Sequence, residues 1–169
     1  MPEASVTRIL RLPGYGVYQH VFDEAAQTVT CWVRPEATRP YCCCPSCGIS
    51  TQATVGNPTE RRVRDLPWGP WQVWLVVEIQ TVACRRCGRH RERVPFLVGK
   101  AHHTARVEAA VAQACTSAPV RRGTAQWGLA VETVRLIDTR ALWRWAVGRG
   151  ARCASSGWTR SSWGRRPGS

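Results

Sequence analysis

Two matching cysteine motifs constrain this chain more than any other feature. Cys44-Pro45-Ser46-Cys47-Gly48 and Cys84-Arg85-Arg86-Cys87-Gly88 both read C-x-x-C-G. Two residues between the cysteines let both sulfur atoms face one ion, and the glycine lets backbone amide groups turn toward the thiolates. Four thiolates make a closed tetrahedral zinc site. The spacing therefore predicts a structural Zn²⁺ ion held by Cys44, Cys47, Cys84 and Cys87.

Other cysteines and histidines are placed outside this predicted site. Cys42 and Cys43 precede the first motif, and neither keeps the two-residue spacing. The remaining candidates are cysteines on apolar stripes, or histidines beside an already complete ligand set: Cys31, Cys115, His102 and His103. Buried cysteines without metal remain an alternative. A thioredoxin-like redox pair is disfavoured because no βαβ pattern surrounds either motif.

The charge of the chain indicates its partner. The formal net charge is +13, and Lys100 is the only lysine. The planar fork of arginine suits phosphates and guanine edges, so the excess predicts a nucleic-acid partner. A GC-rich genome would explain arginine in place of lysine, but not the positive excess. No apolar run of about 18 residues predicts a membrane span, and MPEASVTRIL is not a secretory signal. We expect a cytoplasmic, nucleoid-associated protein, in which metal ligation outranks disulfides.

Strand patterns fill the first part of the chain. Residues 17–22 and 28–33 predict a hairpin. Residues 60–66 and 71–82 predict a second pair around a turn at residues 67–70. The second strand of that pair alternates with a period of two, and its buried face carries Val73, Leu75, Val77 and Ile79. We assign the second pair to a zinc ribbon over residues 41–95, in which it returns the chain to the metal.

Helical periodicity begins after Pro95. A first helix is expected from Thr104, its N-cap, a second from Pro119 to about Trp127, and a third from Val131 to Trp145. A tight turn at Gly128 separates the last two, which is the arrangement of a helix-turn-helix. The predicted fold is α+β, with a small β-rich zinc ribbon, a three-helix helix-turn-helix module and a disordered basic tail. The expected segments are 1–40 (β-rich), 41–95, 101–147 and 148–169.

In a helix-turn-helix the last helix lies in the major groove. We therefore expect Glu132, Thr133 and Arg135 to face base edges. The expected phosphate contacts are Arg121, Arg122, Arg140 and Arg144. A three-helix bundle with solvated arginines would give the same pattern. Ala130 also stands where a Ser or Thr cap would be expected.

The order of these parts resembles a known family. Arg64-Asp65-Leu66-Pro67-Trp68-Gly69, the two C-x-x-C-G motifs and the stretch from Gly128 to Val134 are similar to the N-terminal half of insertion-sequence transposases of the ISL-three type. The resemblance covers roughly residues 10–145. It implies a zinc-containing module that binds double-stranded DNA at the terminal repeats of a transposon. Self-association, or association with intact transposase, is a further expectation.

In that family an RNase H-like catalytic domain follows, and three acidic residues there bind divalent metal. No Asp or Glu follows Asp138 in this chain, so we expect no catalytic activity from it. Around Trp158 a shifted reading frame can, with permissible codon choices, read Val-Asp-Glu-Ile-Phe-Leu-Gly-Lys-Lys, which resembles the start of such a domain. A frameshift that truncated the chain explains this, and a genuine basic tail is the alternative. A stand-alone zinc-ribbon adaptor for protein or RNA, and a thiol oxidoreductase, are the rival functions.

Overall fold

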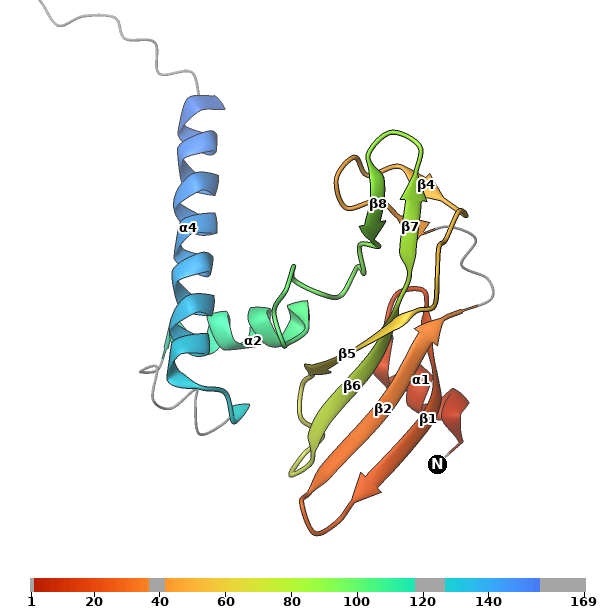
Figure 1. Cartoon of the computed structure of the whole chain (residues 1–169). Helices are drawn as coiled ribbons and strands as arrows, with labels where there is room; N and C mark the ends of the chain where they lie inside the picture. The colour runs from red at the N-terminus through yellow and green to blue at the C-terminus, as the bar shows by residue number, and fades with distance from the viewer. Residues whose placement is uncertain (1, 37–41, 118–126, 156–169) are drawn as a thin grey trace, which may run out of the picture. The chain divides into compact units, whose positions relative to one another are not determined.

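A computed structural model describes residues 2–36, 42–117 and 127–155, with the backbone alone for residues 145–155. The chain divides into two compact units, residues 1–110 and 111–169. The first unit holds the strands and α1 (Glu3–Leu10), as Figure 1 shows. Helix α2 (Ala105–Cys115) runs from the first unit into the second, and α4 (Val131–Ser155) belongs to the second.

The predicted N-terminal hairpin is confirmed. Strands β1 (Tyr15–Asp23) and β2 (Thr28–Pro35) pair antiparallel, with a register shift at Tyr18. The sequence reading missed α1, which precedes the hairpin. Its signal is the spacing of Val6 and Leu10, both fully buried and four residues apart on one helical face.

The second predicted pair also forms, as β5 (Thr59–Arg64) and β6 (Gln72–Ile79). Its hydrophobic face is confirmed, since the four predicted side chains Val73, Leu75, Val77 and Ile79 are all buried. The pairing partner was not predicted, because β6 lies parallel to β2. The result is one four-stranded sheet in the order β1-β2-β6-β5.

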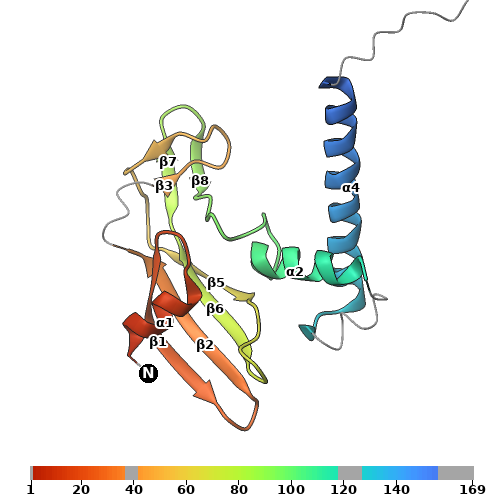
Figure 2. The same ribbon diagram turned by 180° about the vertical axis from the view of Figure 1, so that it is seen from behind.

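One face of this sheet carries the main hydrophobic core. Figures 1 and 2, which are opposite views, both show α1 lying against the sheet. Val6 and Leu10 of α1 join the inward side chains of β1, β2 and β6 in a single cluster. Val94 and Phe96 extend the cluster, and the ring of Phe96 meets that of Tyr15 edge to face at 5.1 Å. The opposite face of the sheet takes no part in this core.

The predicted fold class is wrong in its first half. Residues 59–79 were expected inside a small zinc ribbon, but they form half of the four-stranded sheet. The cysteine motifs lie on two short ladders instead. One pairs β3 (Cys42–Cys43) with β4 (Ser50–Thr51), and the other pairs β7 (Thr81–Cys84) with β8 (Gly88–Arg91). The prediction failed because a period of two identifies a strand and its buried face, but not its neighbour.

Helix α2 is fastened to the sheet unit at its first turn. Thr104 caps the helix as predicted, with its Oγ1 accepting from the Val107 amide at 3.4 Å. The same hydroxyl donates to the buried carboxylate of Asp65 at 2.8 Å. Arg106 donates to both oxygens of Asp65 and, at 2.7 Å, to the carbonyl of Leu10. This network ties the start of α2 to the end of β5 and to α1.

The helical half of the predicted fold class is also wrong. No three-helix helix-turn-helix module is evident in the described residues, where α2 is tied to the sheet and α4 is 25 residues long. The predicted second helix falls almost wholly on residues 118–126, outside the described residues. Gly128 does turn, with φ of 56°, and Val134 and Ile137 are buried as expected, whereas Leu142 is exposed. Residues 148–155 were expected in a disordered tail, but they continue α4.

Candidate metal centre and nucleic-acid interface

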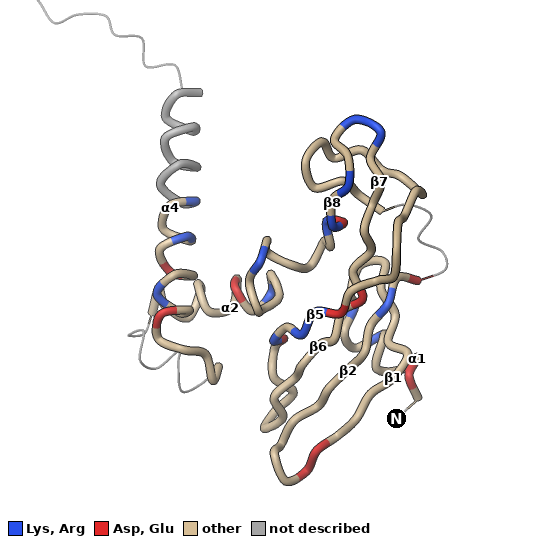
Figure 3. Tube along the Cα trace, viewed as in Figure 1, with Lys and Arg blue, Asp and Glu red and all other residues tan. Residues whose placement is uncertain are grey.

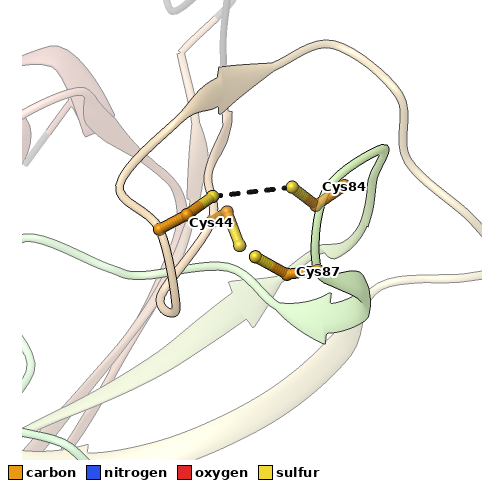
Figure 4. Close-up of side chains that lie close together, drawn as sticks. Cys44, Cys84 and Cys87 are labelled. Atoms are coloured by element: carbon orange, nitrogen blue, oxygen red, sulfur yellow. Dashed lines mark hydrogen bonds between the residues drawn. The ribbon is translucent and has the colours of Figure 1, made fainter.

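Four cysteines converge where the two short ladders meet. The sulfur atoms of Cys44, Cys47, Cys84 and Cys87 all lie within 4.8 Å of one another. Figure 4 shows Cys44, Cys84 and Cys87 pointing toward one another from two separate loops. The Cys47 and Cys84 sulfur atoms are 3.6 Å apart. The structure thus brings together the four residues that the sequence predicted as ligands, and these four could bind one metal ion.

Each cysteine pair sits on a turn that needs glycine. Gly48 has φ of 73° and Gly88 has φ of 83°, the left-handed region that side-chain-bearing residues avoid. In the first turn the Gly48 amide donates to the Cys44 carbonyl at 2.9 Å. In the second, Cys84 and Gly88 are paired across the β7–β8 ladder. The glycine that ends both motifs therefore closes the loop and directs the sulfur atoms to one point.

Backbone amides and shared protons set the ionisation of the sulfur atoms. The amides of Arg86 and Cys87 lower the pKa of the Cys84 thiol to about 7, because they donate hydrogen bonds to its thiolate. The Cys87 pKa is raised to about 12, chiefly through its hydrogen bond with Cys47. The backbone at Ile49 lowers the pKa of Cys47, but burial and the neighbouring thiols raise it overall. A divalent cation that binds four such sulfur atoms displaces their remaining protons.

The other cysteines of the described residues are not members of the four-sulfur group, although Cys42 packs against the same small cluster. Cys43 is half-buried, and its S–H lies 3.5 Å from the Gly48 carbonyl oxygen. Cys31 is fully buried in the main core, and burial raises its thiol pKa to about 12. Cys115 on α2 is half-buried, and burial raises its pKa as well. Cys42 and Cys43 thus fall outside the four-sulfur group, as the spacing predicted.

A cleft of about 1160 Å³ adjoins the first cysteine turn, since Pro45 is part of its lining. Its walls come from β5, β8 and residues 92–105. Six side chains in the lining carry or can carry positive charge: Arg61, His90, Arg91, Arg93, Lys100 and His102. Figure 3 shows the basic residues gathered along the β7–β8 hairpin and the segment that follows it.

The single acidic residue in the described lining is turned inward. Glu92 is buried, and its Oε1 accepts from the Tyr15 hydroxyl at 3.1 Å and from the Gln80 amide at 2.9 Å. Arg61 braces the opposite wall by donating to the carbonyls of Gly99, at 2.8 Å, and Ala101. Burial, and then the nearby charge of Arg91, lower the pKa of Arg61. The accessible charge of the cleft is therefore positive.

The DNA contacts expected from the sequence are distributed along α4, apart from two. Arg121 and Arg122 lie outside the described residues. Glu132, Arg135 and Arg144 are exposed. Thr133 and Arg140 are half-buried. The structure thus places the described members of this set along α4.

The cleft itself was missed by the sequence reading. A signal for it does exist, in the run Arg89-His90-Arg91-Glu92-Arg93 that follows the second cysteine motif. Alternation along this run sends Glu92 inward and leaves Arg91 and Arg93 exposed. The contribution of Arg61 could not be read from the sequence, because it depends on how β5 packs beside residues 99–101.

Comparison with known proteins adds an independent finding. This chain is similar to the transposase of the insertion sequence element IS1001 from Bordetella parapertussis, with 31% identity over 131 residues. The likeness supports a transposase-family origin. The aligned part is 76% of this chain and 32% of that transposase, so the chain spans about a third of the length of the curated relative that it matches. No protein-family profile matches the chain, and no solved structure matches it.

The likeness agrees with the predicted resemblance at the level of insertion-sequence transposases. Among the helices in residues 2–36, 42–117 and 127–155, none combines the length and the apolar composition of a membrane-spanning segment.

Proposed function

We propose that this chain is the DNA-binding portion of an insertion-sequence transposase of the ISL-three type, and that it binds the double-stranded ends of its element. The cationic cleft carries the proposal. Arg61, Arg91, Arg93 and Lys100 bring permanent positive charge to one concave surface, while Glu92 faces inward. Neutralising phosphates with such side chains releases condensed counterions, which drives binding.

We further propose that the four-cysteine group holds Zn²⁺ in a structural role. Four thiolates are the soft donors that Zn²⁺ accepts in tetrahedral geometry. A four-sulfur set leaves no open position for water or substrate, so the ion would stabilise the fold and not react. In the basic β7–β8 hairpin, β7 ends at Cys84 and the turn contains Cys87, so the metal would hold the arginines of that hairpin in place.

Residues of α4 are proposed as a second set of DNA contacts. Arg135 and Arg144 are exposed, whereas Val134 and Ile137 of the same helix are buried. We assign Arg144 to a phosphate, and Thr133 and Arg135 to base edges. This assignment needs only a basic helix beside the duplex.

The test is duplex binding measured by fluorescence anisotropy over a range of salt concentrations. Four phosphate contacts in the cleft would give a slope of log affinity against log salt of about −4. The double variant Arg91→Ala, Arg93→Ala should weaken binding and make the slope shallower by about 2. Arg8→Ala, which removes an exposed arginine of α1, is the matched control and should leave the slope unchanged.

Sequence preference separates end recognition from general affinity for DNA. A duplex carrying the terminal repeat that flanks the coding sequence should bind more tightly than a shuffled duplex of equal length, with the gap persisting at raised salt. Equal affinity for both duplexes would refute recognition of the ends. No duplex binding at low salt would refute the proposed function altogether and favour the adaptor alternative.

A further inference from the structure

The outer face of the four-stranded sheet, opposite the main core, has an unusual composition. Burial alternates along β2, and along β6 except at Val76, so the residues between the core positions share this outer face. Its three aromatic side chains are each half-buried and its arginines reach the surface between them: Tyr18, Trp32, Trp74, Arg34, Arg62 and Arg64. An outer sheet face needs only polar residues to remain soluble, so two tryptophans there require an explanation.

Strand pairing brings these side chains together. Trp32 is paired with Val76 on the neighbouring parallel strand, and Trp74 lies two residues earlier on that strand. From the strand rise and spacing, the Cα atoms of the two tryptophans lie about 8 Å apart. Arg64 is directly opposite Trp74 on β5. Two neighbouring nucleotides of an extended strand can span the two indole rings.

The arginines stack on the aromatic rings. The guanidinium carbons of Arg62 and Arg64 lie 4.3 Å and 4.9 Å from the centre of the Trp74 ring. Arg34 lies 5.0 Å from the centre of the Tyr18 ring. Planar guanidinium groups held over aromatic rings present both a stacking surface and a charge for phosphate.

Acidic residues limit the surface on one side. Glu60 and Glu78 are paired across β5 and β6, near the end of the face that holds Tyr18 and Arg34. The other end holds Trp32, Trp74 and the two arginines of β5, and the register places Asp23 at its far edge, on β1 opposite Thr28. A polyanion would therefore lie across the Trp32–Trp74 end. In the described part of the first unit, α1 and residues 94–97 pack on the opposite face.

We propose that this outer sheet face binds single-stranded DNA, with one base stacked on Trp32, a second on the guanidinium groups that lie over Trp74, and phosphates beside Arg62 and Arg64. A duplex keeps its base faces inside its own stack, so aromatic side chains standing on a sheet can reach only unpaired bases. The inference goes beyond the proposed binding of duplex ends and does not depend on it. It gives the chain a second surface, separate from the cleft, for strands that have been separated.

The experiment compares binding of a fluorescent oligothymidylate of about 12 nucleotides, within the usual site sizes of single-strand-binding folds, with binding of a duplex. Trp32→Thr and Trp74→Thr should each weaken oligothymidylate binding about 5- to 150-fold, the range for loss of one base–aromatic stack. Duplex affinity should not change. Trp32→Phe should restore most of the single-strand affinity, because phenylalanine keeps a stacking face. Circular dichroism and metal content serve as controls for folding.

The cleft variant Arg91→Ala, Arg93→Ala is the reciprocal control and should weaken duplex binding while sparing the oligothymidylate. Unchanged oligothymidylate affinity in both tryptophan variants would overturn the inference, as would an equal loss for duplex and single strand. Photocrosslinking of a halogenated single strand to the unaltered protein avoids any folding defect. Adducts at Tyr18, Trp32 or Trp74 support the proposal, and adducts confined to other residues refute it.

Discussion

Substitution of Cys44 should release the metal and open both cysteine turns, whereas substitution of its neighbour should not. The Cys44 sulfur is fully buried and belongs to the four-sulfur group. The Cys43 sulfur lies outside the group and contacts the Gly48 carbonyl. Cys44→Ser therefore removes a ligand, while Cys43→Ser makes the same chemical change one residue away. The pair also tests which of three consecutive cysteines begins the motif.

The expected loss follows from how little else holds the turns. Val82 is the one residue besides cysteine in the small hydrophobic cluster around the sulfur atoms. Burial of one valine contributes about 1.5–3 kcal/mol. A metal present at 1,000 times its dissociation constant contributes about 4.1 kcal/mol. The metal term is the larger, so its loss should make backbone amides of the turns exchange about 1,000-fold faster if their opening is limited by that free energy.

Two measurements check this prediction. Titration with Cd²⁺, followed by thiolate-to-metal absorbance, should show full binding for Cys43→Ser and impaired binding for Cys44→Ser. Hydrogen exchange should then accelerate in residues 42–51 and 81–91 of Cys44→Ser, while β2 and β6 stay protected by the separate main core. Equal metal binding by the two variants, or unchanged exchange in the turns, would refute the reasoning.

Three further predictions concern the described residues. Arg106→Ala should lower the free energy of unfolding by about 3 kcal/mol, measured in urea, because the buried Asp65 carboxylate loses its charged partner. A decrease of less than about 0.5 kcal/mol, which is usual for surface substitutions, would contradict this. Gly88→Ala should cost about 1–2 kcal/mol because φ is 83°, whereas Gly16→Ala meets only the Glu36 side chain at 3.4 Å and should cost less. Cys31 should resist iodoacetamide at mildly alkaline pH, checked by mass spectrometry, because its pKa of about 12 keeps it a neutral thiol. Because this pKa is higher in the folded state, the contribution of Cys31 to folding stability is fully present below the ordinary thiol pKa and is lost as the pH rises toward 12.

Local patterns in the sequence predicted the strands well because each is set by neighbouring residues. The alternation of Val73, Leu75 and Val77 identified β6 and its buried face. The proline and glycine turn at residues 67–70 identified the break before it, and Thr104 the start of α2. The parallel pairing of β2 with β6 was not predictable in this way. It depends on a crossover of almost forty residues, and nothing in either strand specifies the other.

The candidate sites differ in the same way, between local motifs and surfaces built from distant segments. The four cysteines could be found because a metal-binding turn is a local motif, here present twice. The cleft and the outer sheet face could not, since each combines residues from strands far apart in the chain. Arg61 faces the cleft and its neighbours Arg62 and Arg64 face Trp74, so one short arginine-rich strand serves both surfaces. In the sequence alone these residues are only a basic run.

The cysteine turns and the basic cleft are linked through the backbone of the first unit. The Arg93 amide donates to the Cys43 carbonyl at 2.8 Å, directly beside the first buried sulfur. The Glu92 amide donates to the Gln80 carbonyl at 2.9 Å, which aligns the cleft wall with the start of β7. The cysteine turns and the cleft wall thus share hydrogen bonds, and the arginines cannot keep their spacing if the turns open. In the proposed complex, a metal ion at the four sulfur atoms would support DNA binding by holding this wall in place. Its ligands would not need to contact a phosphate.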